Sequence, residues 1–263
     1  MQTVHSSDGT TIAYDRTGAG PALILVTGEF SNRAVIAPLA ALLAPRLTVF
    51  AYDRRGYGDS GDTPPYAVAR EVEDLAAVIA AAGGSAFAFG HSSGAVLALE
   101  AAARGLAISK LALYEPHFIV DHSRPLPAPD FPAKIEQLLA AGRRGDAVEQ
   151  FLTEAEQVPA EFLAQLRRGP VWLDLQAGAA MLPHDIAIMA GAQKGDPAVL
   201  RRWAGLAVPT LALDGGNSAA WARTAVKMLA ETMPNAQYRT LDGQTHGGDE
   251  AALAPVLLEF FAG

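Results

Sequence analysis

The chain has 263 residues, half of them hydrophobic, which is enough for one large α/β domain or a domain with a sizeable insertion. It contains no cysteine, which excludes disulfides, thiolate catalysis and cysteine metal sites. The net charge of -8 and the pI near 5.2 argue against general binding to nucleic acid or anionic membranes, because both need a surplus of basic residues. Four scattered arginine pairs are interpreted as solvent-exposed: Arg54-Arg55, Arg143-Arg144, Arg167-Arg168 and Arg201-Arg202.

The beginning of the chain predicts strands that alternate with helices. Residues 3–6 and 11–16 flank an Asp-Gly turn and predict an antiparallel hairpin. Residues 22–26 are continuously apolar, as in a strand buried on both faces, residues 34–43 have helical spacing, and residues 47–52 predict another strand. The first apolar run is too short for a signal or membrane segment, so we expect a soluble cytoplasmic protein. The alternation favours a parallel sheet covered by helices.

The next segment, residues 53–61, allows two interpretations. Gly56, Gly58 and Gly61 satisfy G-x-G-x-x-G, which in a dinucleotide site is followed at once by a helix. Pro64 and Pro65 come next instead, and they block a helix at this point. We therefore interpret the segment as a loop without a nucleotide.

The most informative stretch follows a predicted helix over residues 68–82. Apolar residues 86–89 run into Gly90-His91-Ser92-Ser93-Gly94, and a good helix former continues to about Arg104. This order predicts a strand, a sharp turn and a helix. Such a turn holds its central residue in a strained backbone conformation and leaves room only for glycine on either side. Ser92 is therefore a candidate nucleophile.

The rest of the chain predicts a helical segment inside a sheet protein. A strand over residues 110–114 ends at Glu115, and the sequence from His117 to about Leu206 then has many prolines and no convincing strand. So long a segment is better interpreted as a helical insertion than as a loop. The predicted elements are helices at 133–140, 147–155 and 171–181 in the insertion, then a strand at 209–214, a helix at 219–233, a strand at 236–241 and a helix at 253–261.

The serine motif and the order of elements resemble the α/β-hydrolase superfamily over nearly the whole chain. The resemblance implies an α/β-hydrolase fold with a mostly parallel eight-stranded sheet flanked by helices. Residues 1–116 and 207–263 would form the core, and residues 117–206 a helical cap inserted after the sixth strand. Residues 53–60 resemble the Asp-x-Arg-Gly-x-Gly-x-Ser loop of the family, which is mainly structural.

The resemblance implies a base for Ser92, because a serine hydroxyl needs a base within hydrogen-bond reach and a third group that orients it. His246 follows the last predicted strand in a glycine-rich loop, where the family has its catalytic histidine. His91 lies beside Ser92, but its side chain should point elsewhere. The other histidines are more typical of surface or pocket positions: His5, His117, His122 and His184.

The acid of the triad has two candidates. Most family members supply it from the loop after the seventh strand, where this chain has Ser218. Asp214 ends that strand, and Glu115 ends the sixth strand, a place that some branches of the superfamily use. We favour Glu115, whose carboxylate would hold His246 in the right tautomer, and keep Asp214 as the alternative.

The family's oxyanion hole consists of backbone N–H groups. The resemblance implies one donor at Ser93, at the start of a helix, and a second at Glu29, in the loop after the third strand. Gly28 would let that backbone turn inward.

A serine at the turn favours acyl transfer over chemistry that uses a carboxylate nucleophile. We expect a serine hydrolase that cleaves a carboxylic ester or lactone through an acyl-enzyme on Ser92, without cofactor or metal. The alternatives are a carbon–carbon bond hydrolase or an acyltransferase of the same fold, or a ligand receptor that is not an enzyme.

The expected partner is a small hydrophobic ester or lactone, with neither nucleic acid nor membrane, and the chain is expected to be a monomer or homodimer. An apolar pocket suits such a substrate, although ordinary packing is the alternative for each residue. The candidate pocket residues are Phe30, His91, His117, Phe118, Trp172, Met181 and Met189.

Overall fold

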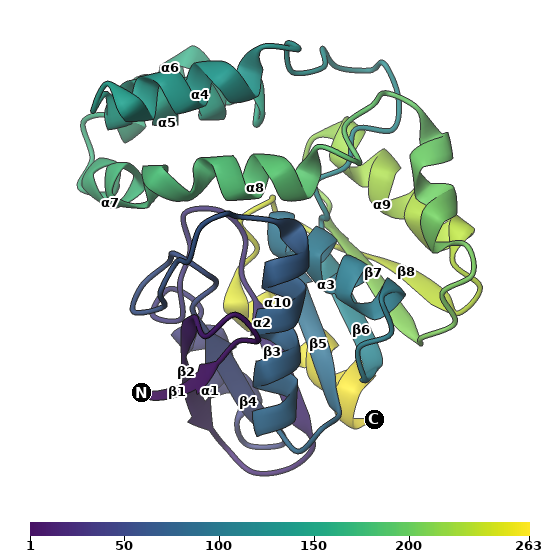
Figure 1. Cartoon of the computed structure of the whole chain (residues 1–263). Coiled ribbons are helices and arrows are strands. Elements are labelled where there is room, and N and C mark those ends of the chain that lie inside the picture. Colours follow the sequence, from purple (N-terminus) through teal and green to yellow (C-terminus); the bar gives the residue numbers. More distant parts are fainter.

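The computed structural model describes residues 1–263, and an eight-stranded sheet forms its centre (Figure 1). The strands are β1 (Gln2–His5), β2 (Thr11–Thr17), β3 (Ala22–Val26), β4 (Thr48–Tyr52), β5 (Ala86–His91), β6 (Ile108–Tyr114), β7 (Thr210–Gly215) and β8 (Ala236–Leu241). Their order is β1-β2-β4-β3-β5-β6-β7-β8, with β2 antiparallel to both of its neighbours and all other pairs parallel. The predicted fold class is confirmed.

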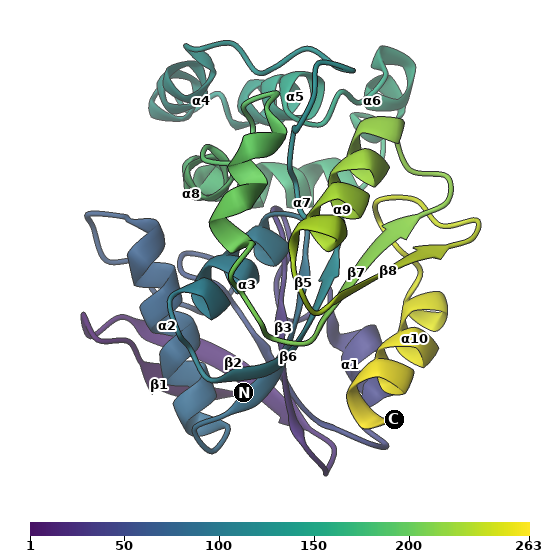
Figure 2. The same cartoon turned by 90° about the vertical axis from the view of Figure 1, so that its right-hand side faces the viewer.

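Helices cover both faces of this sheet. Figure 2 shows α2 (Val68–Ala81) and α3 (Ser93–Ala103) on one side, and α1 (Ala37–Leu43) and α10 (Glu250–Ala262) on the other. Each side has its own buried apolar cluster, and α9 (Ala220–Thr232) contributes to the cluster of α2 and α3. The central strands are apolar on both faces because each face packs against helices.

The chain between β6 and β7 is helical, apart from one isolated bridge between Ile119 and Gln193. In Figures 1 and 2 its first helices lie at one end of the molecule, beyond the sheet. These helices are α4 (Phe131–Ala140), α5 (Arg144–Glu154), α6 (Ala160–Leu166), α7 (Val171–Gly178) and α8 (Leu182–Met189), with 3-10 turns at Ala179–Met181 and Pro197–Trp203. The helical insertion after the sixth strand is confirmed, and its limits at residues 117 and 206 stay a prediction.

The starts of α1 and α10 differ from the prediction, and a side chain hydrogen-bonds the backbone near each of them. The Asn32 side chain accepts hydrogen bonds from the N–H groups of Ala34 and Val35, and this turn delays α1 to Ala37. The Asp249 side chain accepts from Ala251 and Ala252, so α10 begins three residues before the predicted start at Leu253.

The sheet brings four loops to one edge. The chain adds β4 on one side of β3 and β5 on the other, so the direction in which strands are added reverses between β3 and β5. The carboxyl ends of the parallel strands face the same way. In open α/β sheets, ligands bind at such a switch point. The loops after β3, β5, β6 and β8 meet there. None of the helices combines the length and the apolar composition that crossing a bilayer requires.

Candidate active site

Ser92 occupies the sharp turn between β5 and α3. Its backbone has φ 53° and ψ -124°, and the residue is fully buried. A Cβ on Gly90 would lie 2.5 Å from Ala95 Cα, and one on Gly94 would lie 2.4 Å from the Thr27 carbonyl oxygen. Strand and helix thus approach so closely that both flanking positions require glycine.

His246 contacts Ser92 from the loop after β8. Its Nε2 lies 3.1 Å from Ser92 Oγ, and its Nδ1 lies 2.7 Å from Glu115 Oε2. The loop is held in place by the Tyr114 hydroxyl, which donates to the Thr245 carbonyl, and by His91 Nε2, 2.8 Å from the His246 carbonyl. The predicted serine, base and favoured acid therefore form one continuous chain of contacts.

Glu115 lies directly after β6 and is almost fully buried. Its backbone φ of 44° is unusual for a residue with a side chain, and it marks a strained position. Glu115 Oε1 accepts a hydrogen bond from the Gly215 N–H at 2.7 Å, while Oε2 faces His246. Both carboxylate oxygens thus have a partner, which fixes the carboxylate against the imidazole ring.

Asp214, the alternative acid, contacts groups other than His246. It accepts from the Tyr238 hydroxyl at 2.7 Å and lies 3.5 Å from Arg223 Nε. Ser218, where most of the family has its acid, closes a turn by donating its N–H to the Gly215 carbonyl. The structure brings Glu115, and neither of the other two, against the His246 ring.

The loop after β3 runs directly against the serine turn. A Cβ on Gly28 would lie 3.0 Å from Ser92 Cβ, so only glycine lets the loop come this close. The N–H groups of Ser93 and Glu29 have no backbone acceptor, and Ser93 is the first residue of α3. Both N–H groups are free to bind an oxygen beside Ser92.

The model of the alpha/beta hydrolase family matches residues 23–256 of this chain. The chain belongs to the alpha/beta hydrolase family. Pimeloyl-[acyl-carrier protein] methyl ester esterase from Xanthomonas campestris pv. campestris (strain B100) is 31% identical to it, over 94% of this chain and 98% of that protein.

Solved structures of alpha/beta hydrolases have the same fold. An alpha/beta hydrolase from Sphaerobacter thermophilus DSM 20745 is 55% identical, with a TM-score of 0.94 over 99% of this chain and 100% of that chain. The enol-lactonase from Burkholderia xenovorans LB400 has a TM-score of 0.78 at 19% identity, over 100% of both chains, and shares the fold.

In this alpha/beta hydrolase, carboxylates surround His246. Ser92 Oγ donates to Glu29 Oε1 at 3.2 Å, and ligand atoms of Glu29, Glu156 and His246 all lie within 4.8 Å of one another. A small cation could fit atoms at this spacing. Both ring nitrogens of His246 are already engaged by Glu115 and Ser92, however, so we interpret the cluster as the surroundings of Ser92.

These charges shift the pKa values of the site. Burial alone would lower the pKa of His246, but the hydrogen bond to Glu115 and the charges of Glu156, Glu115 and Glu29 raise it to about 9. Burial would raise the pKa of Glu115, and its hydrogen bond and ion pair with His246 hold it below the usual value. Burial, together with Glu156 and Asp185, raises the pKa of Glu29.

The candidate pocket residues lie in different surroundings. Phe30 and Met181 line a cavity of about 770 Å³, which lies between the β3 and β4 loops and α7 and does not include Ser92. His91 packs its ring against His246, and His117 Nδ1 lies 3.1 Å from Glu156 Oε1.

The other three pocket candidates pack against apolar clusters. Phe118 stacks on Trp203 inside the cluster of α2 and α3, whereas Met189 and Trp172 pack in or against the cluster of the insertion. A role in substrate binding stays a prediction for all seven residues.

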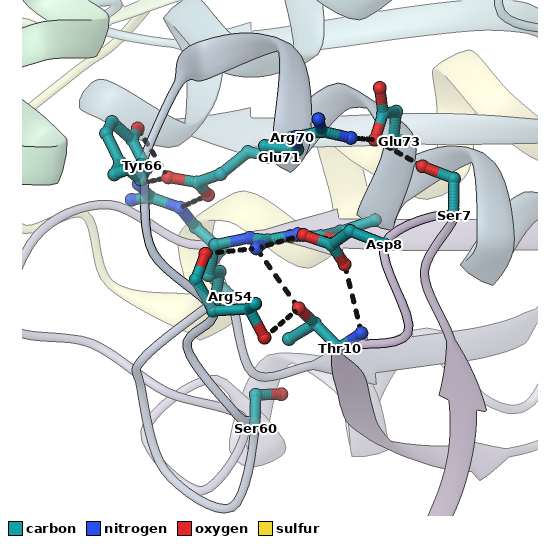
Figure 3. Close-up of polar contacts among 12 residues, drawn as sticks. Ser7, Asp8, Thr10, Arg54, Ser60, Tyr66, Arg70, Glu71 and Glu73 are labelled. Atoms are coloured by element: carbon teal, nitrogen blue, oxygen red, sulfur yellow. Dashed lines mark hydrogen bonds and ion pairs between the residues drawn. The ribbon is translucent and has the colours of Figure 1, made fainter.

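The interpretation of Arg54 and Arg55 as solvent-exposed is wrong, because both are fully buried. Arg54 pairs with Glu71 of α2 at 2.8 Å, beside Tyr66, as Figure 3 shows, and with Asp185 of α8 at 2.7 Å. Asp185 also accepts from the Ser93 hydroxyl at 2.7 Å, so this network reaches the residue that follows Ser92. Neither the partners of these charges nor the Glu29 and Glu156 carboxylates could be assigned from sequence spacing.

Proposed function

We propose that this alpha/beta hydrolase is a serine hydrolase that cleaves a carboxylic ester or lactone. The contact chain from Glu115 through His246 to Ser92 carries the proposal, because it joins a nucleophile, a base and a group that orients the base. Free N–H groups at Ser93 and Glu29 would complete the site for an acyl transfer.

In the proposed mechanism, Ser92 Oγ attacks the substrate carbonyl carbon while His246 Nε2 takes the serine proton. Glu115 stabilises the imidazolium that forms, and the two N–H groups bind the oxyanion. His246 then gives the proton to the leaving alcohol, which leaves an acyl group on Ser92. Water, activated by His246, releases the acid and restores the serine.

The name of the curated relative supports an ester as the substrate, since that protein is described as a methyl ester esterase. The same contact chain could also cleave a carbon–carbon bond, pass the acyl group to another acceptor, or remain in a receptor without turnover. The cytoplasmic location and the monomeric or homodimeric state expected from the sequence stay predictions.

The experiment compares p-nitrophenyl butyrate, an aliphatic methyl ester, a simple lactone and a vinylogous diketone as substrates. We expect hydrolysis of an ester or the lactone, labelling of Ser92 by a fluorophosphonate, and loss of at least about 10⁴-fold in kcat for Ser92→Ala. Ser123→Ala, at an exposed serine of the insertion, is the matched control and should be unchanged. Turnover of the diketone alone, or no labelling of a folded protein, would contradict the proposal.

A further inference from the structure

The side chain of Glu29 lies at the reacting atom without a charge partner of its own. Its Oε1 is 3.2 Å from Ser92 Oγ, and its Oε2 is buried with no hydrogen-bond partner. The backbone N–H of the same residue belongs to the proposed oxyanion hole. The carboxyl group therefore lies beside the atom that a substrate carbonyl must reach.

An ionised carboxylate in this place would oppose acyl transfer. Negative charge develops on the substrate oxygen as Ser92 attacks, and like charges a few ångströms apart in a buried site repel strongly. A neutral carboxylic acid in the same place would do the opposite, because its O–H can donate to the developing oxyanion.

The surroundings of Glu29 favour the neutral form. The Glu156 and Asp185 carboxylates, together with burial, raise the pKa of Glu29, while His246 and His117 act in the other direction. Tyr57 and Glu115 also face the site, and His91, packed against His246, stays uncharged at neutral pH because burial lowers its pKa to about 4. Glu156 is itself held ionised by His117, and its pKa is lowered to about 2.

Building on the proposed function, we propose that Glu29 is a further catalytic residue, a carboxylic acid that hydrogen-bonds the oxyanion beside the Ser93 and Glu29 N–H groups. In the step itself the bond from Ser92 Oγ to the carbonyl carbon forms, and the carbonyl π pair moves onto oxygen. The serine proton passes to His246 Nε2, and Glu29 keeps its own proton throughout.

In this role the activity depends on how many protons Glu29 and His246 carry together, because both side chains contact Ser92 Oγ. The active form has the proton on Glu29 and a neutral His246. Activity toward a neutral ester therefore falls at low pH, where both groups are protonated, and again above about pH 9, where the pair loses its last proton. A site in which Glu29 takes no part would instead gain activity as His246 loses its proton through about pH 9.

The test is the pH dependence of kcat/KM for the wild type, Glu29→Gln and Glu29→Ala with an uncharged p-nitrophenyl ester. Glutamine keeps an N–H donor and cannot ionise, so we expect maximal activity within about fivefold of wild type and no loss above about pH 9. Alanine removes the donor and should lower kcat about 10² to 10³-fold. Glu161→Gln, at an exposed glutamate of α6, is the matched control and should keep the wild-type profile.

Thermal unfolding and fluorophosphonate labelling verify that each variant folds and keeps a reactive Ser92. A folded Glu29→Gln variant as weak as Glu29→Ala at every pH, or wild-type activity that keeps rising above about pH 9, would overturn the role of Glu29 and leave the proposed function standing. A wild-type protein that is neither labelled by the fluorophosphonate nor able to hydrolyse any ester would contradict both the role of Glu29 and the proposed function.

Discussion

Three residues with unusual backbone conformations surround the proposed chemistry. Phe30, Ser92 and Glu115 have φ angles of 55°, 53° and 44°, a region that residues with side chains rarely adopt. Each lies in the loop directly after a neighbouring strand, β3, β5 or β6. Such strain persists only where the surrounding packing enforces it, and it concentrates at functional sites.

The choice between the two candidate acids can be tested with isosteric variants. Glu115→Gln should lower kcat by roughly 10³ to 10⁴-fold, because the amide cannot stabilise the His246 imidazolium. Asp214→Asn should keep most of the activity, since Asp214 contacts Tyr238 and Arg223 and not His246. Steady-state kinetics on one ester decides the assignment, and a severe loss in the Asp214 variant alone would refute it.

The ion pair between Glu115 and His246 should make the stability of the fold depend on pH. The folded-state pKa of His246 is raised from 6.5 to about 9, so the stabilisation is complete below about pH 6.5 and is lost as the pH rises through about 9. The difference in melting temperature between wild type and Glu115→Gln should therefore shrink between about pH 6.5 and about pH 10. A difference that stays constant would show that the charge on His246 does not contribute.

At the scale of elements, a buried ion-pair network fastens α8 to the core. Asp185 of α8 accepts from Arg54 and from the Ser93 hydroxyl, and Arg54 also pairs with Glu71 of α2. Removal of one partner leaves a buried charge without compensation. The network thus links the insertion, the β4 loop and the start of α3.

We expect Asp185→Ala to lower the free energy of unfolding by about 3 to 5 kcal/mol in a denaturant titration. The control is Asp130→Ala, which removes an exposed pair with Lys134 and should change stability by less than about 1 kcal/mol. Equal effects of the two variants would show that the buried network does not stabilise the fold.

The limits of β3 could be predicted because its apolar run is continuous, and the limits of β8 also match the prediction although β8 is mostly polar and exposed. Helix ends were harder, since the Asn32 turn and the Asp249 cap depend on local hydrogen bonds. The burial of Arg54 and Arg55 could not be predicted, because their acidic partners come from distant segments. The positions of charged residues along a sequence do not show which arginine pairs with which acid in the fold.

At the scale of the whole molecule, the sheet topology collects the candidate site from four loops. The sequence could place Ser92 and His246 by motif and order, yet both Glu115 and Asp214 end neighbouring strands at the same sheet edge. Only the backbone turn at Glu115 and the Gly215 N–H direct one carboxylate toward the histidine.

The cavity of about 770 Å³ between the β3 and β4 loops and α7 gives a further prediction. A side chain at Gly178 would point at Phe30, 3.5 Å from the ring, and would fill part of this cavity. If long acyl chains occupy it, Gly178→Leu should raise KM for long-chain esters by about tenfold and leave butyrate esters unchanged. A KM for long-chain esters that is the same in Gly178→Leu and in the wild type would place the acyl chain elsewhere.

The central claim is that Ser92 forms a covalent acyl-enzyme through His246. Rapid quenching of the wild-type protein with p-nitrophenyl butyrate, followed by mass spectrometry of its peptides, tests it most directly. We expect a butyryl group on the peptide that contains Ser92, formed together with a burst of p-nitrophenol, and neither signal in Ser92→Ala. Turnover at the wild-type rate in Ser92→Ala, or an acyl group on a different residue, would contradict the claim.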